Sequence, residues 1–186
     1  STESFPWKHT EQPFNVEECD VPRFEADDSE LNNYLSEHGY AIVKCVATPD
    51  VIHTSLDKLW TFLEETIGMR RNDINTWTDE NFCKMGSLNS GILHSSGINQ
   101  SDFLWSLRML PKVKTAFASI FKTDDLITSF DGGNIFRPWQ IPVEGAEFAR
   151  TQGGWYHVDQ GRLLRGMQCV QGLVTLTPVN AHTGGF

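Results

Sequence analysis

A histidine and an aspartate two residues apart, His157 and Asp159, are the side chains of this sequence best suited to hold a metal ion together. In an extended strand, residues i and i+2 point to the same face, so the imidazole and the carboxylate would lie side by side. With a second histidine, such a pair binds iron(II) on one side and leaves three coordination positions for a chelating 2-oxo acid and oxygen. The spacing therefore predicts two of the three protein ligands of a non-haem iron site.

The pair alone is a weak signal, because 6 histidines and 12 aspartates among 186 residues would produce about 0.4 such pairs by chance. The related sequence His9-Thr10-Glu11 lies between two prolines in an irregular stretch, and we interpret it as surface residues. His157 instead follows an apolar Gly153–Tyr156 run and precedes a turn, as at the end of a strand that opens toward a cavity. The alternative interpretation is a strand-end histidine beside an unrelated turn aspartate.

The elements that must position this pair change character along the chain. Residues 1–30 are rich in proline and acidic residues and predict an irregular lead-in, and residues 31–186 predict one domain. Three- and four-residue apolar spacing predicts helices at residues 31–35, 52–67, 103–107 and 113–121, with a cap at 48–50 and Pro111 in a first turn.

Short apolar runs predict strands at residues 40–46, 126–130, 134–137, 154–159 and 169–177. A Gly- and Ser-rich loop at 86–97 lies between these two regions. Helices first and strands last predict an α+β domain whose helices brace a sheet sandwich or barrel.

Composition narrows the classes of function. With 39% hydrophobic and 11% aromatic residues the chain has the material for a proper core. Its net charge of -9 disfavours nucleic acid and anionic membranes as partners, and no apolar run is long enough for a membrane span. Its four cysteines are scattered, which predicts a reducing compartment such as the cytoplasm. A small-molecule substrate is the expected partner, and the sequence indicates no particular oligomeric state.

Several ordered blocks of the chain, taken together, resemble the phytanoyl-CoA dioxygenase family. The blocks are residues 31–46, 105–111, 126–138 (Leu-Ile-Thr-Ser-Phe-Asp-Gly-Gly-Asn-Ile-Phe-Arg-Pro), 155–160 (Trp-Tyr-His-Val-Asp-Gln) and 168–177 leading into Thr183–Phe186. The resemblance implies a mainly β fold, the double-stranded β-helix (a cupin-like jelly roll), braced by N-terminal helices. It also implies iron(II) at His157 and Asp159, with 2-oxoglutarate and O2 as co-substrates. The implied reaction hydroxylates an organic substrate and releases succinate and CO2.

The family pattern continues beyond the part that this sequence contains. Members of the family follow the Thr-Gly-Gly-Phe block with a distal histidine, which completes the metal site, and an arginine that pairs with 2-oxoglutarate. We expect both residues, and the last strands of the jelly roll, beyond Phe186. His182 is the one histidine that follows the pair in this sequence, but its neighbours Pro178, Asn180 and Gly184 are typical of a turn.

Four further residues are candidates for contact with the co-substrate, and three for contact with the substrate. The co-substrate candidates are Asn134, Arg137, Gln171 and Thr175. The substrate candidates are His94 in the Gly- and Ser-rich loop, and Arg162 and Arg165 after the pair. Each has a plainer alternative: strand-edge exposure for the first two, core packing for the next two, and a solvated loop for the last three.

Three classes of function follow from these observations. The first is an iron(II)- and 2-oxoglutarate-dependent dioxygenase that hydroxylates a small or medium-sized organic molecule. The second is a jelly-roll module that binds a ligand or partner without catalysis. The third is a cupin-like metalloenzyme that uses no 2-oxo acid. A histidine and an arginine downstream of Phe186 would favour the first class.

Overall fold

The computed structural model describes residues 21–151, 157 and 159–179, and its regular structure is mostly helical. The α-helices are α1 (Leu31–His38), α2 (Pro49–Phe62), α3 (Asp79–Cys83), α4 (Asp102–Arg108) and α5 (Pro111–Phe121). Shorter turns of helix are η1 (Leu63–Ile67), η2 (Ile74–Thr76) and η3 (Ile98–Gln100). The strands are β1 (Arg23–Phe24), β2 (Ile42–Val43), β3 (Ile92–Leu93) and β4 (Gly133–Asn134). Within the described residues, no helix has both the length and the apolar character that crossing a membrane requires.

The helices begin and end where local sequence signals predict. The hydroxyl of Thr48 accepts a hydrogen bond from the Val51 backbone N–H at 3.3 Å and caps α2, whose first residue is Pro49. Gly39 ends α1 with φ at 78°, a left-handed conformation that costs glycine little. α2 continues directly into the π-helical turn η1, so the predicted helix at 52–67 is confirmed as a helical segment.

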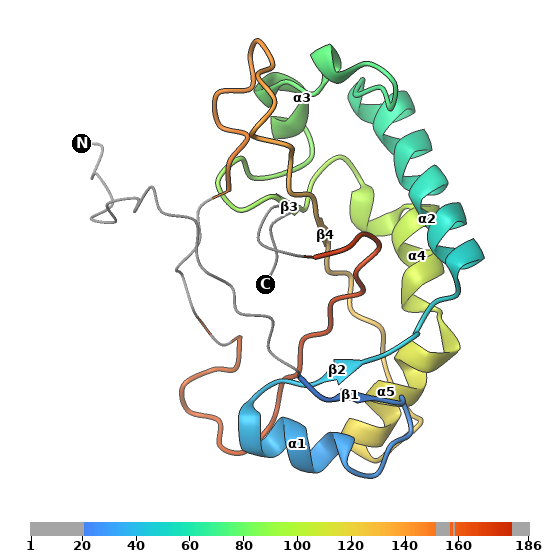
Figure 1. Ribbon diagram of the computed structural model, residues 1–186. Coiled ribbons are helices and arrows are strands. Elements are labelled where there is room, and N and C mark those ends of the chain that lie inside the picture. Colours follow the sequence, from blue (N-terminus) through green and yellow to red (C-terminus); the bar gives the residue numbers. More distant parts are fainter. Residues whose placement is uncertain (1–20, 152–156, 158, 180–186) are drawn as a thin grey trace.

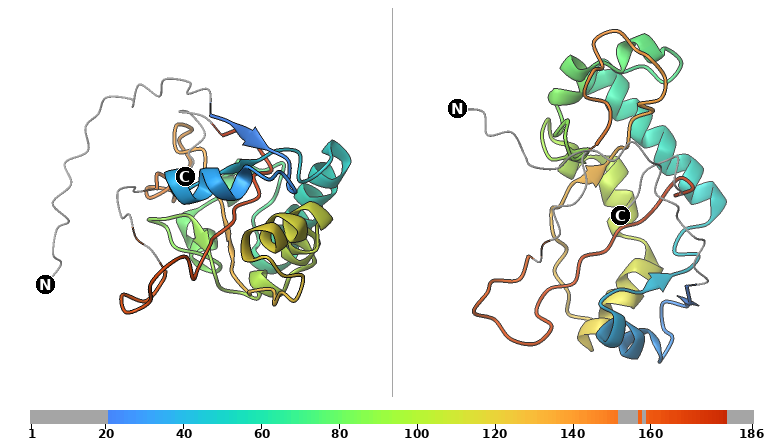
Figure 2. Two further views of the ribbon diagram at one scale, coloured as in Figure 1. Left: turned by 90° about the horizontal axis from the view of Figure 1, so that it is seen from below. Right: turned by 60° about the vertical axis from the view of Figure 1, so that its left-hand side comes forward.

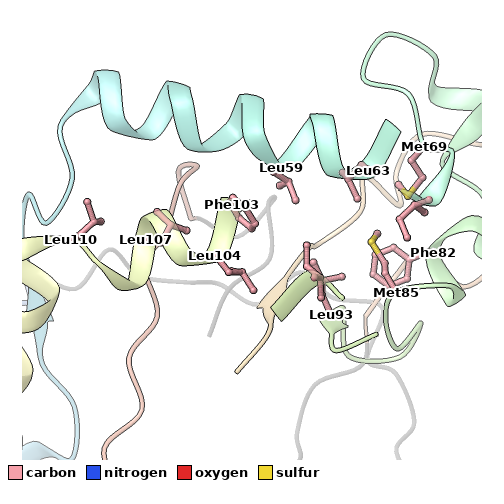
Figure 3. Packing of buried hydrophobic residues seen from close by; sticks show 12 residues of the cluster. Leu59, Leu63, Met69, Phe82, Met85, Leu93, Phe103, Leu104, Leu107 and Leu110 are labelled. Atoms are coloured by element: carbon pink, nitrogen blue, oxygen red, sulfur yellow. The ribbon is translucent and has the colours of Figure 1, made fainter. Parts of the chain in front are cut away.

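The hydrophobic core lies where α2 and η1 pack against α4 and the segment from α3 to β3. Figure 3 shows Leu59 and Leu63 directed from this long helix toward Phe103 of α4 and toward Phe82 and Met85. Leu63, Phe82 and Met85 are almost completely buried. The amphipathic stripes that predicted these helices therefore became the core, as burial of apolar surface requires.

Each sheet is a pair of two-residue strands. β1 and β2 are parallel, with Arg23 opposite Ile42, and β3 and β4 are antiparallel, with Ile92 opposite Asn134. The second pair needs a very close approach, because a Cβ at Gly132 would collide with the carbonyl group of Leu93. Glycine at this position lets the chain just before β4 lie close against the end of β3.

The predicted jelly roll is wrong for the part of the chain that the structure describes. That fold needs long strands paired into two sheets, whereas here two sheets of two short strands accompany the helices. In the segments predicted as strands at 126–130 and 169–177, the structure assigns no strand. Several of their apolar side chains are exposed, with Ile127 at 99%, Phe130 at 56% and Leu173 at 49%. Val174 and Leu176 are partly buried against the core, although they form no strand. The alternating apolar residues give β-propensity, but a strand also needs a neighbouring backbone to bond with, and none of the described segments supplies one here.

The other strand predictions are partly correct. Within 40–46 only Ile42–Val43 forms a strand, and within 134–137 only Asn134 belongs to one. The loop predicted at 86–97 contains β3. The strand predicted at 154–159 lies largely outside the described residues, as does most of the predicted lead-in.

The loop of residues 160–168 extends away from the long helices, whereas the segment that follows it returns to them, with Gly172 close to Phe117 of α5 and with Val174 and Leu176 packed against the core. α2, α4 and α5 lie along one side, and the red-orange loop of residues 160–168 extends from the opposite side (Figure 1). The two further views agree with this arrangement (Figure 2). The helices and the segments packed on them thus supply the core, and the loop after the predicted metal ligands extends away from it.

Candidate metal centre

His157 and Asp159 lie together at the surface. Nε2 of His157 is 3.4 Å from Oδ1 of Asp159, and their side chains are 47% and 44% exposed. Since Nε2 and Oδ1 are 3.4 Å apart, an ion roughly 2 Å from each would bind them at an angle of about 115°, and closure of the pair would give an octahedral angle. An imidazole nitrogen and a carboxylate oxygen are donors that suit iron(II) and other divalent transition metals. The two residues therefore fit part of such a site.

A second histidine–aspartate pair shows why distance alone does not define a metal site. On α2, Nε2 of His53 is also 3.4 Å from a carboxylate oxygen, Oδ2 of Asp57. The other oxygen of Asp57 lies 2.6 Å from the guanidinium of Arg71. A cation already neutralises that carboxylate, which weakens any attraction for a metal ion. The described neighbour of Asp159 is instead an uncharged amide, that of Gln171.

A closed loop follows the metal pair and is fastened by Gln160. The side-chain amide of Gln160 donates to the carbonyl of Gly166 at 2.9 Å and accepts from the backbone N–H of Gln168 at 2.8 Å. Inside the loop, the side chain of Gln168 donates to the carbonyl of Arg165 at 3.0 Å. The chain thus turns back on itself immediately after Asp159.

Gln171 meets Asp159 because of this turn. Its Nε2 donates a hydrogen bond to Oδ2 of Asp159, the carboxylate oxygen that does not face His157 in the pair. The structure therefore brings together His157, Asp159 and Gln171, which come from opposite ends of the loop. Gln171 was predicted as a co-substrate contact, and its partner here is the aspartate.

Arg137 and Asn134 belong to a different cluster, beside α3 and β3. Arg137 is 5% exposed, and its Nη1 donates to Oδ1 of Asp79 at 2.7 Å while Nη2 donates to the carbonyl of Phe148 at 2.9 Å. Oδ2 of Asp79 accepts from the backbone N–H of Phe148 at 2.9 Å. The amide of Asn134 faces the carbonyl of Ser90 at 3.5 Å. Arg137 and Asp79 thus tie the segment that leads toward the metal pair onto α3.

The remaining predicted site residues are exposed. Thr175, His94, Arg162 and Arg165 all lie at the surface. Arg162 and Arg165 belong to the closed loop, where the guanidinium of Arg165 donates to the carbonyl of Arg162 at 3.1 Å. These two arginines are the cationic side chains nearest in sequence to the metal pair.

Two residues that organise this region escaped prediction from sequence. Asp79 lies 58 positions before Arg137, and no local pattern connects them. Gln160 follows Asp159 directly, and a glutamine placed before a glycine turn is a signal that could have been recognised.

A third ligand has no candidate in the described part of the chain. Among residues 21–151, 157 and 159–179, no three histidine, cysteine, aspartate or glutamate side chains gather as a metal-binding group. His182, the alternative third ligand, lies outside the described residues.

Comparison with known proteins identifies one informative similarity. Over 152 residues, which are 80% of this chain, the sequence is 28% identical to a protein named Ava biosynthesis cluster protein O from Aspergillus versicolor. The matched region is 45% of that protein, so the chain spans less than half the length of its relative. No protein-family profile matches the chain, and no solved structure matches it. The similarity thus connects the chain with a protein named for a biosynthesis cluster.

Proposed function

We propose that this chain carries two metal ligands of an iron(II)- and 2-oxoglutarate-dependent oxygenase that hydroxylates a small organic molecule in a biosynthetic pathway. The observation that carries the proposal is the 3.4 Å approach of His157 Nε2 to Asp159 Oδ1 at an accessible surface. The ordered blocks that resemble the phytanoyl-CoA dioxygenase family support the choice of metal and co-substrate. The name of the Aspergillus versicolor relative supports a role in biosynthesis.

In this proposal the protein's residues bind the iron(II) ion and attract the anionic co-substrate. His157 and Asp159 supply one neutral and one anionic donor, which leaves an iron(II) ion with residual positive charge for an anionic co-substrate. Arg162 and Arg165, on the loop after the pair, raise the local potential for an anion against the net charge of -9. When bound, iron(II) supplies oxygen activation: one oxygen atom enters the substrate C–H bond, and the other enters succinate as CO2 leaves the 2-oxo acid.

Arg137 has a positioning role in this account. Its guanidinium is engaged by Asp79 and Phe148, and burial keeps it away from solvent. We assign it to anchoring residues 137–148, which lead toward the metal pair. Asn134 and Thr175 stay as proposed contacts of the co-substrate, and His94 as a proposed contact of the substrate.

A second candidate function is a binding module without catalysis. It is favoured by the observation that the described residues contain no group of three metal-ligating side chains. In this alternative the pair at 157 and 159 holds a metal weakly or not at all, and 2-oxoglutarate has no effect.

Anaerobic titration of the full-length protein with iron(II) and then 2-oxoglutarate separates the two candidates. The oxygenase predicts a weak visible charge-transfer absorption that develops only when both are present, and that His157→Ala abolishes. If no absorption develops at saturating concentrations of both, the oxygenase proposal fails and the binding module is favoured. If His157→Ala retains the absorption, the assignment of the ligand is wrong.

A further inference from the structure

The two carboxylate oxygens of Asp159 have different neighbours. Oδ1 is 3.4 Å from Nε2 of His157, and Oδ2 accepts a hydrogen bond from the amide of Gln171. A free carboxylate rotates about its Cβ–Cγ bond and presents either oxygen, or both, to a cation. A hydrogen bond to one oxygen restricts this rotation and leaves the other oxygen directed at the metal position.

The position of Gln171 is set by the closed loop before it. Gln160 uses both halves of its side-chain amide across the loop, to Gly166 and to Gln168. Leu164 adds a backbone turn, since its N–H donates to the carbonyl of Gly161 at 2.9 Å. These bonds return the chain to Asp159 at residue 171. The loop thus delivers Gln171 to the aspartate.

We propose that Gln171 is a positioning residue that holds Asp159 as a one-oxygen ligand, with Gln160 fixing the loop that brings Gln171 into place. The inference rests on the proposed function, because it assumes that His157 and Asp159 bind a metal. An amide suits this task since it donates a hydrogen bond, carries no charge and does not titrate. It therefore orients the carboxylate without neutralising it, unlike Arg71, whose charge neutralises Asp57.

Binding through one oxygen has a chemical consequence for the site. A carboxylate that binds through both oxygens fills two coordination positions, and Ca²⁺ accepts this arrangement readily. When Gln171 donates its hydrogen bond to Oδ2, Asp159 fills one coordination position of the metal, and more positions remain for a chelating co-substrate. Loss of Gln171 should thus weaken binding of a six-coordinate transition metal more than binding of Ca²⁺.

The test measures metal affinity without turnover. Mn²⁺ is titrated into the full-length protein and the free ion is followed by electron paramagnetic resonance, with Ca²⁺ affinity measured by competition. Gln171→Leu removes the donor at similar size and should weaken Mn²⁺ binding about 10- to 100-fold, the range for loss of a partner that orients a ligand. Gln168→Leu is the matched control, because its side chain bonds only within the loop in the described structure, and it should change Mn²⁺ affinity less than Gln171→Leu. Gln160→Leu should weaken binding through the loop.

The outcomes separate the inference from the function on which it rests. If the unaltered protein binds no Mn²⁺, the proposed function fails first. If it binds Mn²⁺ and Gln171→Leu binds equally well, the positioning role is overturned while the metal site stands. Equal loss of Mn²⁺ and Ca²⁺ affinity in Gln171→Leu also overturns it, because a general disturbance of the surface would affect both ions alike. Circular dichroism checks that each variant is folded. If Gln171→Leu does not fold, Gln160→Leu becomes the test, and unchanged Mn²⁺ affinity in that variant overturns the positioning role of Gln171.

Discussion

Replacing Asp79 by asparagine removes the carboxylate that faces the buried guanidinium of Arg137. The two groups are 2.7 Å apart, and the side chain of Arg137 is 3% exposed and that of Asp79 13% exposed. Arg137 also lies over the ring of Phe82, with 4.5 Å from its Cζ to the ring centroid, so the cation is enclosed on several sides. Without its counter-ion, this charge stays in a region from which water is largely excluded.

The expected cost follows from the burial of the pair. Removal of one partner from a buried ion pair costs about 3–5 kcal/mol of unfolding free energy. We expect about 3 kcal/mol for Asp79→Asn, because the asparagine oxygen still accepts one hydrogen bond. The matched control is Asp57→Asn, which breaks the pair with Arg71 at 2.6 Å, where both side chains are more than 40% exposed. Screening by water limits that cost to about 1 kcal/mol or less.

Urea unfolding followed by tryptophan fluorescence measures both changes. The double variant Asp79→Asn/Arg137→Met should be more stable than the sum of the two single changes predicts, because it leaves no unpaired charge buried. If Asp79→Asn and Asp57→Asn cost the same, the pair at Arg137 is not buried as described. The proposed anchoring of residues 137–148 would then have no energetic basis.

Three further predictions address the core, the close approach of Gly132 to β3 and the response of stability to acid. Leu63→Ala should cost about 2–5 kcal/mol in urea unfolding, because Leu63 is 1% exposed at the centre of the core. Gly132→Ala should lower the melting temperature, because its Cβ would collide with the carbonyl group of Leu93, whereas Gly161→Ala meets open space and should not; equal effects would contradict this close approach. Hydrogen bonding to Lys112, the largest cause, holds the pKa of Glu25 below its ordinary value of 4.5. Its contribution to stability is therefore present above that value and is lost as pH falls through the lowered pKa. Glu25→Gln should reduce the fall of the melting temperature in this acidic range, and an unchanged fall would contradict the pairing of Glu25 with Lys112.

The sequence predicted the helices well because their signals are local. The hydroxyl of Thr48 caps α2 within three residues of itself, and Gly39 ends α1 with its own backbone conformation. Such features need no distant partner. The apolar stripes also predicted the buried faces of α2 and α4, whereas core residues such as Phe82 and Met85 come from a segment for which no helix was predicted.

The strands and the site needed partners far away in the sequence. Ile127 lies in an apolar run that favours a strand, but β-structure depends on a second backbone, which sequence pattern alone does not supply. Arg137 was recognised as a candidate, while Asp79, its partner, lies 58 positions earlier. The approach of Gln171 to Asp159 depends on closure of the loop between them, which alternation of side chains along one strand does not describe.

Metal binding at His157 and Asp159 can be measured by isothermal titration of the protein with Mn²⁺. The unaltered full-length protein should bind one ion, and His157→Ala should lose that binding. The control is His53→Ala, because His53 has the same 3.4 Å distance to a carboxylate oxygen, yet that carboxylate is neutralised by Arg71. We expect His53→Ala to bind Mn²⁺ as the unaltered protein does. Unchanged binding in His157→Ala, or loss of binding in His53→Ala, would contradict metal binding at His157 and Asp159.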